Sequence, residues 1–189
     1  MDHLSSKTRI LIATAGFGEG HNSAAKGLKE VLGNDETAQI VDPCMIAAPR
    51  TTERIQDTYR KLTVYSPQVW KGIYKACGWN DFSKERNPVM RKVRNTLGDL
   101  IEDKDVEALL STYFIYPYFL ERHVKRQGRK VPVYTVVTDS IEINAAWNKA
   151  PTDYFLVTDE FTKQSMVNSG IDEKKSSLQA LLFTLVLQT

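Results

Sequence analysis

Cysteine is scarce in this chain of 189 residues, which contains only Cys44 and Cys77. No secretory signal precedes them, because the first apolar run, residues 9–13, is far too short to be one. We therefore expect a reduced cytoplasmic setting in which both thiols are free.

Long hydrophobic runs are also missing from the sequence. No stretch approaches the roughly 20 apolar residues that a membrane-spanning helix needs, so any association with a membrane is expected to be peripheral. The formal net charge of +2 is too small to argue for binding of nucleic acid. Internal repeats and low-complexity segments are absent, and the length predicts one domain with a sizeable core.

What the chain does contain is an alternation of apolar strands and amphipathic helices. Residues 10–13 predict a buried strand, and apolar residues at helical spacing over 24–32 predict a helix that ends at Gly33. A second strand at 39–42 stops at Pro43, which completes a right-handed strand–helix–strand unit. This alternation predicts an α/β fold, a parallel sheet with helices on both faces. Further strands are predicted at 106–112, 131–137 and 154–157, and further helices at 117–125 and 159–168.

The middle of the chain is rich in basic residues. Residues 50–104 are expected to be helical, lysine and arginine outnumber acids over 54–94, and tyrosine and tryptophan lie among them from residue 65 onward. Aromatic and basic side chains together favour the surface of an anionic membrane. The alternative is an ordinary pair of amphipathic helices that covers the sheet.

The main functional signal is the glycine-rich loop after the first predicted strand. Gly16, Gly18 and Gly20 precede His21 at the carboxyl end of that strand, where open α/β sheets bind ligands. Backbone amides in such a loop can approach an anion at the helix N-terminus. The dinucleotide fingerprint requires glycine where His21 stands, and no Gly-Lys-Ser/Thr of a P-loop follows. A tight turn without a ligand is the other interpretation.

His21 is a candidate general base. It is expected in the first turn of a helix, where the partial positive charge disfavours the imidazolium and keeps the ring neutral. Asp139 follows another predicted strand, so it is expected at the same edge, either to orient His21, to bind a hydroxyl or simply to cap a turn. Trp147 is expected to line the substrate site or to pack in the core.

The residues around His21 resemble the opening of the monogalactosyldiacylglycerol synthases and the processive diacylglycerol glucosyltransferases. Val137-Thr138-Asp139 followed by Trp147 is similar to a second motif of that family, and Ser111-Thr112 before Tyr113 to a third, weaker one. The resemblance covers about residues 8–175. The first motif reads Ile10-Leu11-Ile12-Ala13-Thr14-Ala15-Gly16-Phe17-Gly18-Glu19-Gly20-His21-Asn22-Ser23-Ala24-Ala25.

This resemblance implies the Rossmann-like N-terminal domain of a GT-B glycosyltransferase. Such an enzyme transfers a hexose from a nucleotide sugar, here a UDP-sugar, to diacylglycerol with inversion and generally without a metal or other cofactor. The N-terminal domain holds the lipid, and residues 65–94 correspond to its membrane-facing part, at the inner face of the membrane. His21 is implied as the base and Asp139 as its support. The implied acceptor-binding residues are Gly16, Gly18, Gly20, Asn22, Asn144 and Trp147.

The sequence departs from the family pattern in three places. Asn144 stands where many relatives have histidine, and Tyr113 where a histidine often follows Ser-Thr. The apolar run 178–187 replaces the Gly-Pro turn that leads into the donor-binding domain, so we expect a truncation or altered reading frame near Lys175. The domain is accordingly expected over 1–175 and an atypical, aggregation-prone tail over 176–189. A Rossmann-type module that binds a nucleotide or phosphorylated ligand without catalysis is the alternative, and an inactive remnant is a third.

Overall fold

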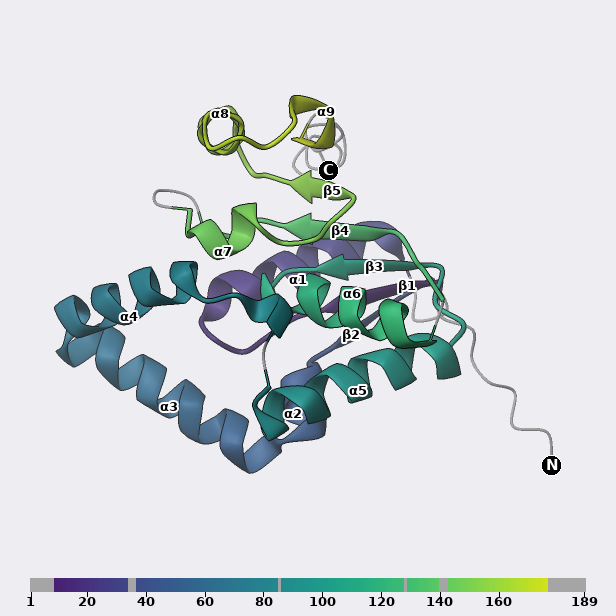
Figure 1. Cartoon of the computed structure of the whole chain (residues 1–189), viewed down its shortest axis with the longest axis horizontal. Coiled ribbons are helices and arrows are strands. Elements are labelled where there is room, and N and C mark those ends of the chain that lie inside the picture. The colour runs from purple at the N-terminus through teal and green to yellow at the C-terminus, as the bar shows by residue number, and fades with distance from the viewer. Residues whose placement is uncertain (1–8, 34–36, 85, 128, 140–142, 177–189) are drawn as a thin grey trace.

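The computed structural model describes residues 9–33, 37–84, 86–127, 129–139 and 143–176. Within them lies a five-stranded parallel sheet with the strand order β2-β1-β3-β4-β5 (Figure 1). The predicted parallel α/β sheet is therefore confirmed. The strands are β1 (Ile10–Ala13), β2 (Ala38–Val41), β3 (Ala108–Ser111), β4 (Val133–Val136) and β5 (Tyr154–Leu156).

Helices connect the strands and cover both faces of the sheet, as the alternating pattern predicts (Figure 1). The basic segment, residues 50–104, folds into three long helices. Each of them has a proline at its first position, where the missing N–H is tolerated, whereas a proline inside a helix would interrupt it. The helices are α1 (Glu19–Leu32), α2 (Pro43–Ala47), α3 (Pro49–Tyr65), α4 (Pro67–Trp79), the 3-10 helix η1 (Phe82–Lys84), α5 (Pro88–Asp103), α6 (Ile115–Gln127), α7 (Ala145–Asn148), α8 (Glu160–Asn168) and α9 (Glu173–Ser176).

The short helix α2 is an element that the sequence pattern does not predict. Pro43 ends β2, as expected, but it also occupies the first turn of α2, where its missing N–H costs nothing. Asp42 caps that helix, because its Oδ1 accepts a hydrogen bond of 2.9 Å from the amide of Met45. A proline that stops a strand therefore starts a helix here.

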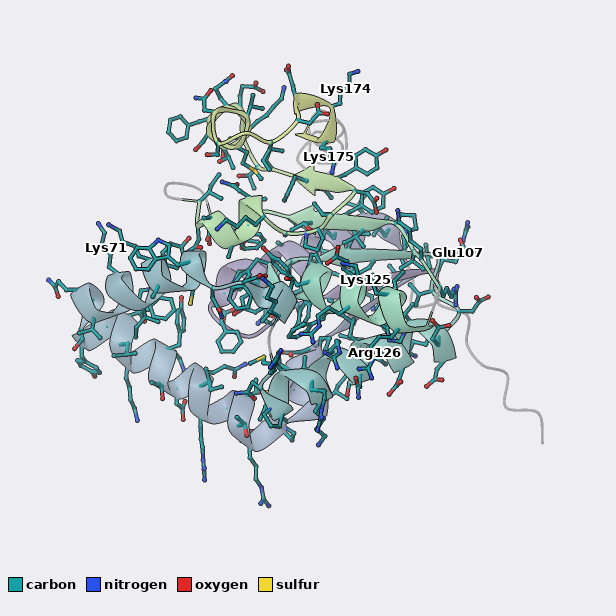
Figure 2. The ribbon with its side chains drawn as sticks, in the orientation of Figure 1. Lys71, Glu107, Lys125, Arg126, Lys174 and Lys175 are labelled. Atoms are coloured by element: carbon teal, nitrogen blue, oxygen red, sulfur yellow. The ribbon has the colours of Figure 1, made fainter. Side chains whose placement is uncertain are left out.

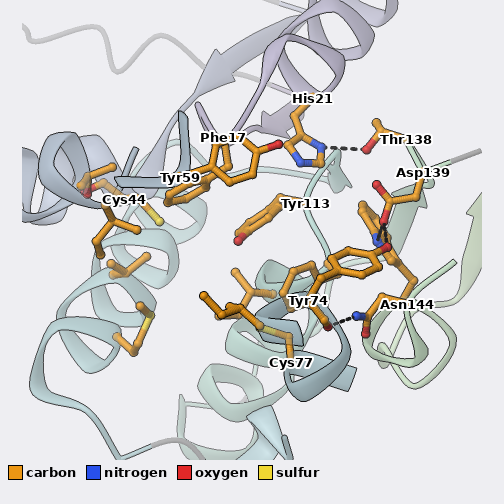
Figure 3. A pocket seen from close by; sticks show the side chains of 18 of the residues that line it. Phe17, His21, Cys44, Tyr59, Tyr74, Cys77, Tyr113, Thr138, Asp139 and Asn144 are labelled. Carbon is orange, nitrogen blue, oxygen red and sulfur yellow. Dashed lines mark hydrogen bonds between the residues drawn. The ribbon is translucent and has the colours of Figure 1, made fainter. Parts of the chain in front are cut away.

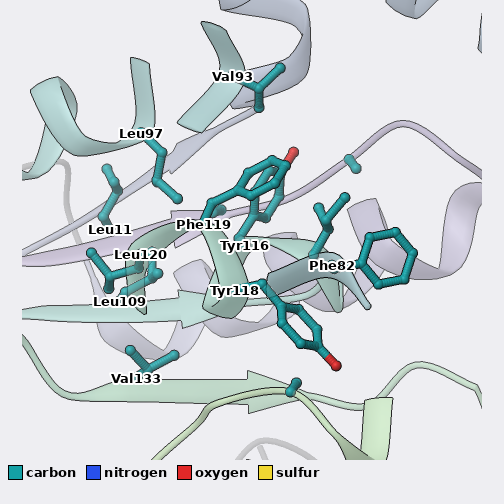
Figure 4. Close-up of a cluster of buried hydrophobic side chains, with 14 of the residues drawn as sticks. Leu11, Phe82, Val93, Leu97, Leu109, Tyr116, Tyr118, Phe119, Leu120 and Val133 are labelled. Carbon is teal, nitrogen blue, oxygen red and sulfur yellow. The ribbon is translucent and has the colours of Figure 1, made fainter. Parts of the chain in front are cut away.

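The core lies on both sides of the sheet. On one face, Leu11 and Leu109 pack with Leu97 of α5 and Phe119 of α6, all of them buried (Figure 4). On the other face, Ile12 of β1 belongs to a second buried cluster with Ala25 and Leu28 of α1 and Val136 of β4. Strands buried on both faces explain the continuous apolar runs in the sequence.

Helices α3 and α4 form a hairpin that projects beyond the edge of the sheet (Figure 1). Large apolar side chains remain exposed at its tip, with Val64 69%, Tyr65 81% and Val69 54% accessible. Trp79 at the end of α4 is 83% accessible. The described helices include none that is both long and apolar enough to cross a membrane.

Most of the predicted apolar tail, residues 177–189, lies outside the described residues. Of the predicted tail, only Ser176 is described, as the last residue of α9. The proposed domain boundary at residue 175 and the aggregation of the tail therefore stay predictions.

Candidate active site

The candidate site lies at the carboxyl edge of the sheet. Because β1, β3 and β4 are parallel, the segments that follow them meet at one edge. These segments are residues 14–18, which lead into α1, residues 112–114 and residues 137–139. Open α/β sheets bind ligands at this edge.

The side chains of Asp42 and Asn22 accept hydrogen bonds from the glycine-rich loop and the residues that lead into it. The amide of Gly16 donates to Asp42 Oδ2 at 3.2 Å, and the hydroxyl of Thr14 donates to Asn22 Oδ1 at 3.0 Å. Burial raises the pKa of Asp42, and the hydrogen bonds from the Met45 and Gly16 amides oppose that shift. Asp42 is thus a loop-supporting residue that sequence reasoning missed, since it reads as the end of a strand.

Glycine is required at one position of the loop more clearly than at the others. Gly18 has φ of +100°, and a Cβ there would lie 3.4 Å from the hydroxyl of Tyr59. A Cβ at Gly16 would lie 2.5 Å from the amide nitrogen of Gln56, the end of a flexible side chain, and one at Gly20 would meet nothing within 4 Å. Gly16, Gly18, Gly20 and Asn22 are not among the residues that line the cavity described below, so their acceptor-binding role stays a prediction.

His21 lies in the first turn of α1, as the sequence predicts. Its Nδ1 atom is 2.7 Å from Thr138 Oγ1, and its ring packs against the edge of the Tyr113 ring, with the centroids 5.2 Å apart (Figure 3). Burial lowers the pKa of His21 below its ordinary value of 6.5, and the charge of Asp139 and the Thr112 backbone partly offset this effect. The ring is therefore neutral at physiological pH, chiefly because of burial.

Asp139 lies beside His21 but makes its hydrogen bonds elsewhere. Its Oδ2 atom accepts one from the Tyr74 hydroxyl at 2.5 Å and one from the Trp147 indole N–H at 2.7 Å. It acts on His21 through charge, whereas the hydrogen bond to the ring involves Thr138. Thr138 belongs to the same sequence motif as Asp139, and that adjacency is the signal that could have identified it.

Asn144 joins two helices at the border of the site. Its side-chain oxygen accepts from the Ala146 amide at 2.9 Å and caps α7, and its amide donates to the Tyr74 carbonyl of α4. A Cβ at Gly78 would lie 2.7 Å from that oxygen, so the absence of a side chain there lets α4 approach α7 closely. These bonds occupy Asn144 structurally, while its predicted contact with an acceptor stays untested.

A cavity of about 650 Å³ opens beside His21, between the sheet edge and the hairpin of α3 and α4 (Figure 3). This volume lies in the roughly 300–1,000 Å³ range of ligand sites. His21, Asp139, Asn144 and Trp147 all line it, so the structure brings these four predicted residues together, while their roles stay predictions. The other described residues that line it are Phe17, Cys44, Thr51, Thr52, Ile55, Tyr59, Trp70, Ile73, Tyr74, Cys77, Val89, Met90, Val93, Tyr113, Phe114, Ile115 and Thr138.

The cavity wall is mostly apolar and aromatic. Neither lysine nor arginine is present among the described residues that line it. Both cysteines line it as free thiols, as expected, and burial raises the pKa of Cys44 to about 11. The described residues also contain no group of three or more His, Cys, Asp or Glu side chains that could hold a metal ion. The lining suits an uncharged, largely apolar ligand better than a phosphate group.

The aromatic stretch predicted to face a membrane divides between three environments. Trp70 and Tyr74 line the cavity, Phe82 is buried in the core, and Tyr65 and Trp79 are exposed. Within α4, Trp70 and Tyr74 are four positions apart and share the face that lines the cavity, whereas Tyr65 belongs to α3 and Phe82 to η1. Contact of this segment with a membrane stays a prediction, and the sequence analysis did not identify Tyr59, Trp70 and Tyr74 as residues that the hairpin contributes to the site.

Comparison with known proteins agrees with the family resemblance seen in the sequence. Residues 21–179 match the family model described as monogalactosyldiacylglycerol (MGDG) synthase. No solved structure matches the chain significantly.

Three curated relatives illustrate the degree of similarity. The uncharacterized glycosyltransferase YkoN of Bacillus subtilis (strain 168) is 22% identical over 178 residues, which cover 93% of this chain and 47% of the relative. The processive diacylglycerol beta-glucosyltransferase of the same organism is 23% identical, covering 88% and 44%. The protein of that name from Bacillus cereus (strain B4264) is 24% identical, covering 86% and 42%. The chain thus spans somewhat less than half the length of these relatives.

Proposed function

The chain belongs to the monogalactosyldiacylglycerol synthase family, and on that premise we propose that it is the acceptor-binding half of a glycolipid glycosyltransferase. The whole enzyme transfers a hexose from a UDP-sugar to diacylglycerol with inversion. The observation that carries this proposal is the position of His21, a neutral imidazole at the edge of a largely apolar cavity. The names of the relatives supply the acceptor class.

The cavity chemistry supports a lipid rather than a nucleotide as the ligand of this half. A diphosphate requires cationic or backbone donors, and the described residues of the cavity wall supply no lysine or arginine. Diacylglycerol has one hydroxyl, two esters and long apolar chains, so it matches a wall of aromatic and aliphatic side chains with few polar groups. The nucleotide-binding module without catalysis is therefore the less favoured function.

His21 is proposed to act as a general base on the acceptor hydroxyl. In the tautomer that donates Nδ1–H to Thr138 Oγ1, the Nε2 atom keeps a lone pair for the hydroxyl proton. The hydroxyl oxygen forms a bond to the anomeric carbon as the bond from that carbon to UDP breaks, and the proton passes to His21. Asp139 then stabilises the resulting imidazolium through its charge.

The exposed hairpin suggests how the acceptor enters. Ile55 and Ile73 line the cavity and are also 43% and 41% accessible, so the cavity opens on the same surface as the exposed apolar residues of α3 and α4. Lys71 (Figure 2) and Lys75 are also exposed on α4, each two positions from Ile73. We propose that this hairpin contacts the inner face of an anionic membrane, from which diacylglycerol reaches His21 without crossing water.

Binding and turnover are tested separately. Titration of the chain with dioctanoylglycerol, followed by tryptophan fluorescence, is expected to saturate, whereas UDP-glucose and UDP-galactose are expected not to bind. Formation of glycolipid from these substrates is expected to be negligible with the chain alone, so it is assayed with a separately supplied donor-binding domain of a relative, once with the parent chain and once with His21→Ala. Tight binding of the nucleotides and none of the lipid would show that the proposal is wrong. Transfer at an unchanged rate in His21→Ala would remove His21 from the mechanism.

A further inference from the structure

Tyr113 presents to the cavity a hydroxyl that has no hydrogen-bond partner among the described residues. Among the described residues, the hydroxyls of Tyr74, Tyr116 and Tyr118 donate to Asp139, to the Thr14 carbonyl and to the Ala146 carbonyl. That of Tyr113 makes no hydrogen bond with any described residue, although its ring lines the cavity. Tyr113 is half-buried, and its Oη atom is not among the buried polar atoms that lack a partner, so water can reach it through the cavity. A ligand that fills the cavity displaces that water, and the phenol then stays paired only if a ligand oxygen accepts its hydrogen bond.

The position of this hydroxyl is fixed by packing of the ring. The Tyr113 ring stacks on Phe17 with centroids 5.5 Å apart and planes at 26°, and Phe114 and Tyr116 contact it at 4.8 Å and 5.8 Å. Its carbonyl accepts a hydrogen bond of 2.6 Å from the Ser111 hydroxyl. The donor is therefore preorganised, which lowers the entropy lost when a ligand binds.

The phenol of Tyr113 stays protonated at physiological pH and can therefore donate a hydrogen bond. Burial raises the pKa of Tyr113 far above its ordinary range, and the neighbouring Cys44, Cys77 and Asp139 act in the same direction. A neutral phenol among apolar walls suits a neutral acceptor atom such as a carbonyl oxygen.

The hydroxyl of Tyr113 lies away from His21, where the reacting hydroxyl of the acceptor is proposed to bind. The edge of the Tyr113 ring lies against His21, but the hydroxyl points away from His21 into the cavity (Figure 3). A lipid whose reacting hydroxyl lies at His21 therefore meets Tyr113 with a second oxygen, a few bonds from the first. In diacylglycerol that oxygen is an ester carbonyl.

We propose that the Tyr113 hydroxyl donates a hydrogen bond to an ester carbonyl of the acceptor and thereby selects ester-linked over ether-linked glycerolipids. This inference rests on the proposed function. It gives Tyr113 a role in specificity rather than in proton transfer. The family resemblance alone offers no such role, since a histidine often occupies this position.

The test compares two lipids and two variants of the full chain. Dioctanoylglycerol and its di-O-octyl ether analogue are titrated into the parent chain, Tyr113→Phe and the control Tyr154→Phe. Fluorescence is the readout, because Trp70 and Trp147 line the cavity. Tyr154 is at the start of β5, at the opposite edge of the sheet, and undergoes the same loss of a hydroxyl.

The parent chain is expected to bind the ester more tightly than the ether. Tyr113→Phe is expected to weaken ester binding about three- to tenfold, the equivalent of one hydrogen bond, and to leave ether binding unchanged. Unchanged ether binding also shows that the variant is folded, and Tyr154→Phe is expected to behave like the parent.

Two results overturn the inference in different ways. An ester-to-ether ratio that is the same in Tyr113→Phe and in the parent chain excludes this role for Tyr113 and leaves the proposed function intact. Failure of the parent chain to bind either lipid overturns the proposed function and, with it, the role of Tyr113.

Discussion

The Nδ1 atom of His21 lies 2.7 Å from the Oγ1 atom of Thr138, across 117 positions of the sequence. This contact joins the start of α1 to the segment after β4, so the two strongest sequence motifs meet in one hydrogen bond. It also restricts the tautomer and orientation of the ring that we propose as the base.

Removing the Thr138 hydroxyl is expected to release the His21 ring. Thr138→Val keeps the side-chain shape and is expected to cost about 0.5–1.5 kcal/mol of unfolding free energy, whereas Thr138→Ser keeps the hydroxyl and most of the stability. Urea denaturation of both variants measures the difference. Equal stability of the valine variant and the parent would show that the hydrogen bond contributes nothing.

The pKa of His21 is expected below 6.5, because burial disfavours the charged ring. Titration of its Cε1 proton by NMR, assigned with His21→Gln, measures the value. Asp139→Asn removes the charge that favours the imidazolium and is expected to lower the pKa further. A midpoint at or above 6.5 in the parent chain would contradict the expected burial.

The lowered pKa of His21 is expected to make the free energy of unfolding depend on pH. The unfolded chain takes up a proton near 6.5 and the folded chain only at lower pH, so the unfolded state binds more protons between the two pKa values. The His21 contribution is therefore complete above pH 6.5 and is lost as pH falls towards the folded pKa. The difference in unfolding free energy between the parent and His21→Gln, measured by urea denaturation from pH 7.5 to 5, should narrow or change sign as pH falls.

Asp42 is expected to support both α2 and the glycine-rich loop, since it accepts from the Met45 and Gly16 amides. Asp42→Ala should cost about 1–2 kcal/mol of unfolding free energy and also weaken binding of dioctanoylglycerol. Asp159→Ala is the matched control, because Asp159 caps α8 through the Thr162 amide without lining the cavity. Equal lipid affinity in the two variants would mean that the loop does not depend on Asp42.

Two glycines of α4 are expected to respond oppositely to alanine. Gly78→Ala places a Cβ 2.7 Å from Asn144 Oδ1, which is already bound to α7, and should destabilise the chain by about 1–3 kcal/mol. Gly72→Ala meets nothing within 4 Å and should stabilise it by about 0.4–1 kcal/mol. Thermal unfolding followed by circular dichroism separates them. Equal shifts in both variants would show that α4 does not pack closely on α7.

The tip of the hairpin is expected to bind anionic vesicles. The double variant Val64→Ser and Val69→Ser removes exposed apolar area and should reduce sedimentation with phosphatidylglycerol vesicles several-fold without changing the melting temperature. Phe161→Ser on α8 removes a side chain that is also exposed, at 71%, and serves as the control. Loss of sedimentation only in the α8 variant would assign membrane contact to a different surface.

The sequence by itself determined the order of strands and helices and the position of His21 at the carboxyl edge of a parallel sheet. These features depend on apolar periodicity and on turn residues that are neighbours along the chain, such as Gly33 after α1. Local signals did not predict the short elements η1, α7 and α9, nor α2, where Pro43 both ends β2 and begins a helix.

Only the tertiary structure decided which groups surround His21. Tyr74 from the hairpin and Trp147 from α7 converge on Asp139, and Tyr113 lies against the His21 ring with a hydroxyl that no described residue engages. Trp147 is only eight residues from Asp139, but Tyr74 is 65 residues away and reaches Asp139 because α4 packs on α7. The contact of Tyr113 with His21 joins the segment after β3 to α1. Periodicity can identify which face of a helix is apolar, but the packing of that face determines which ligand it meets.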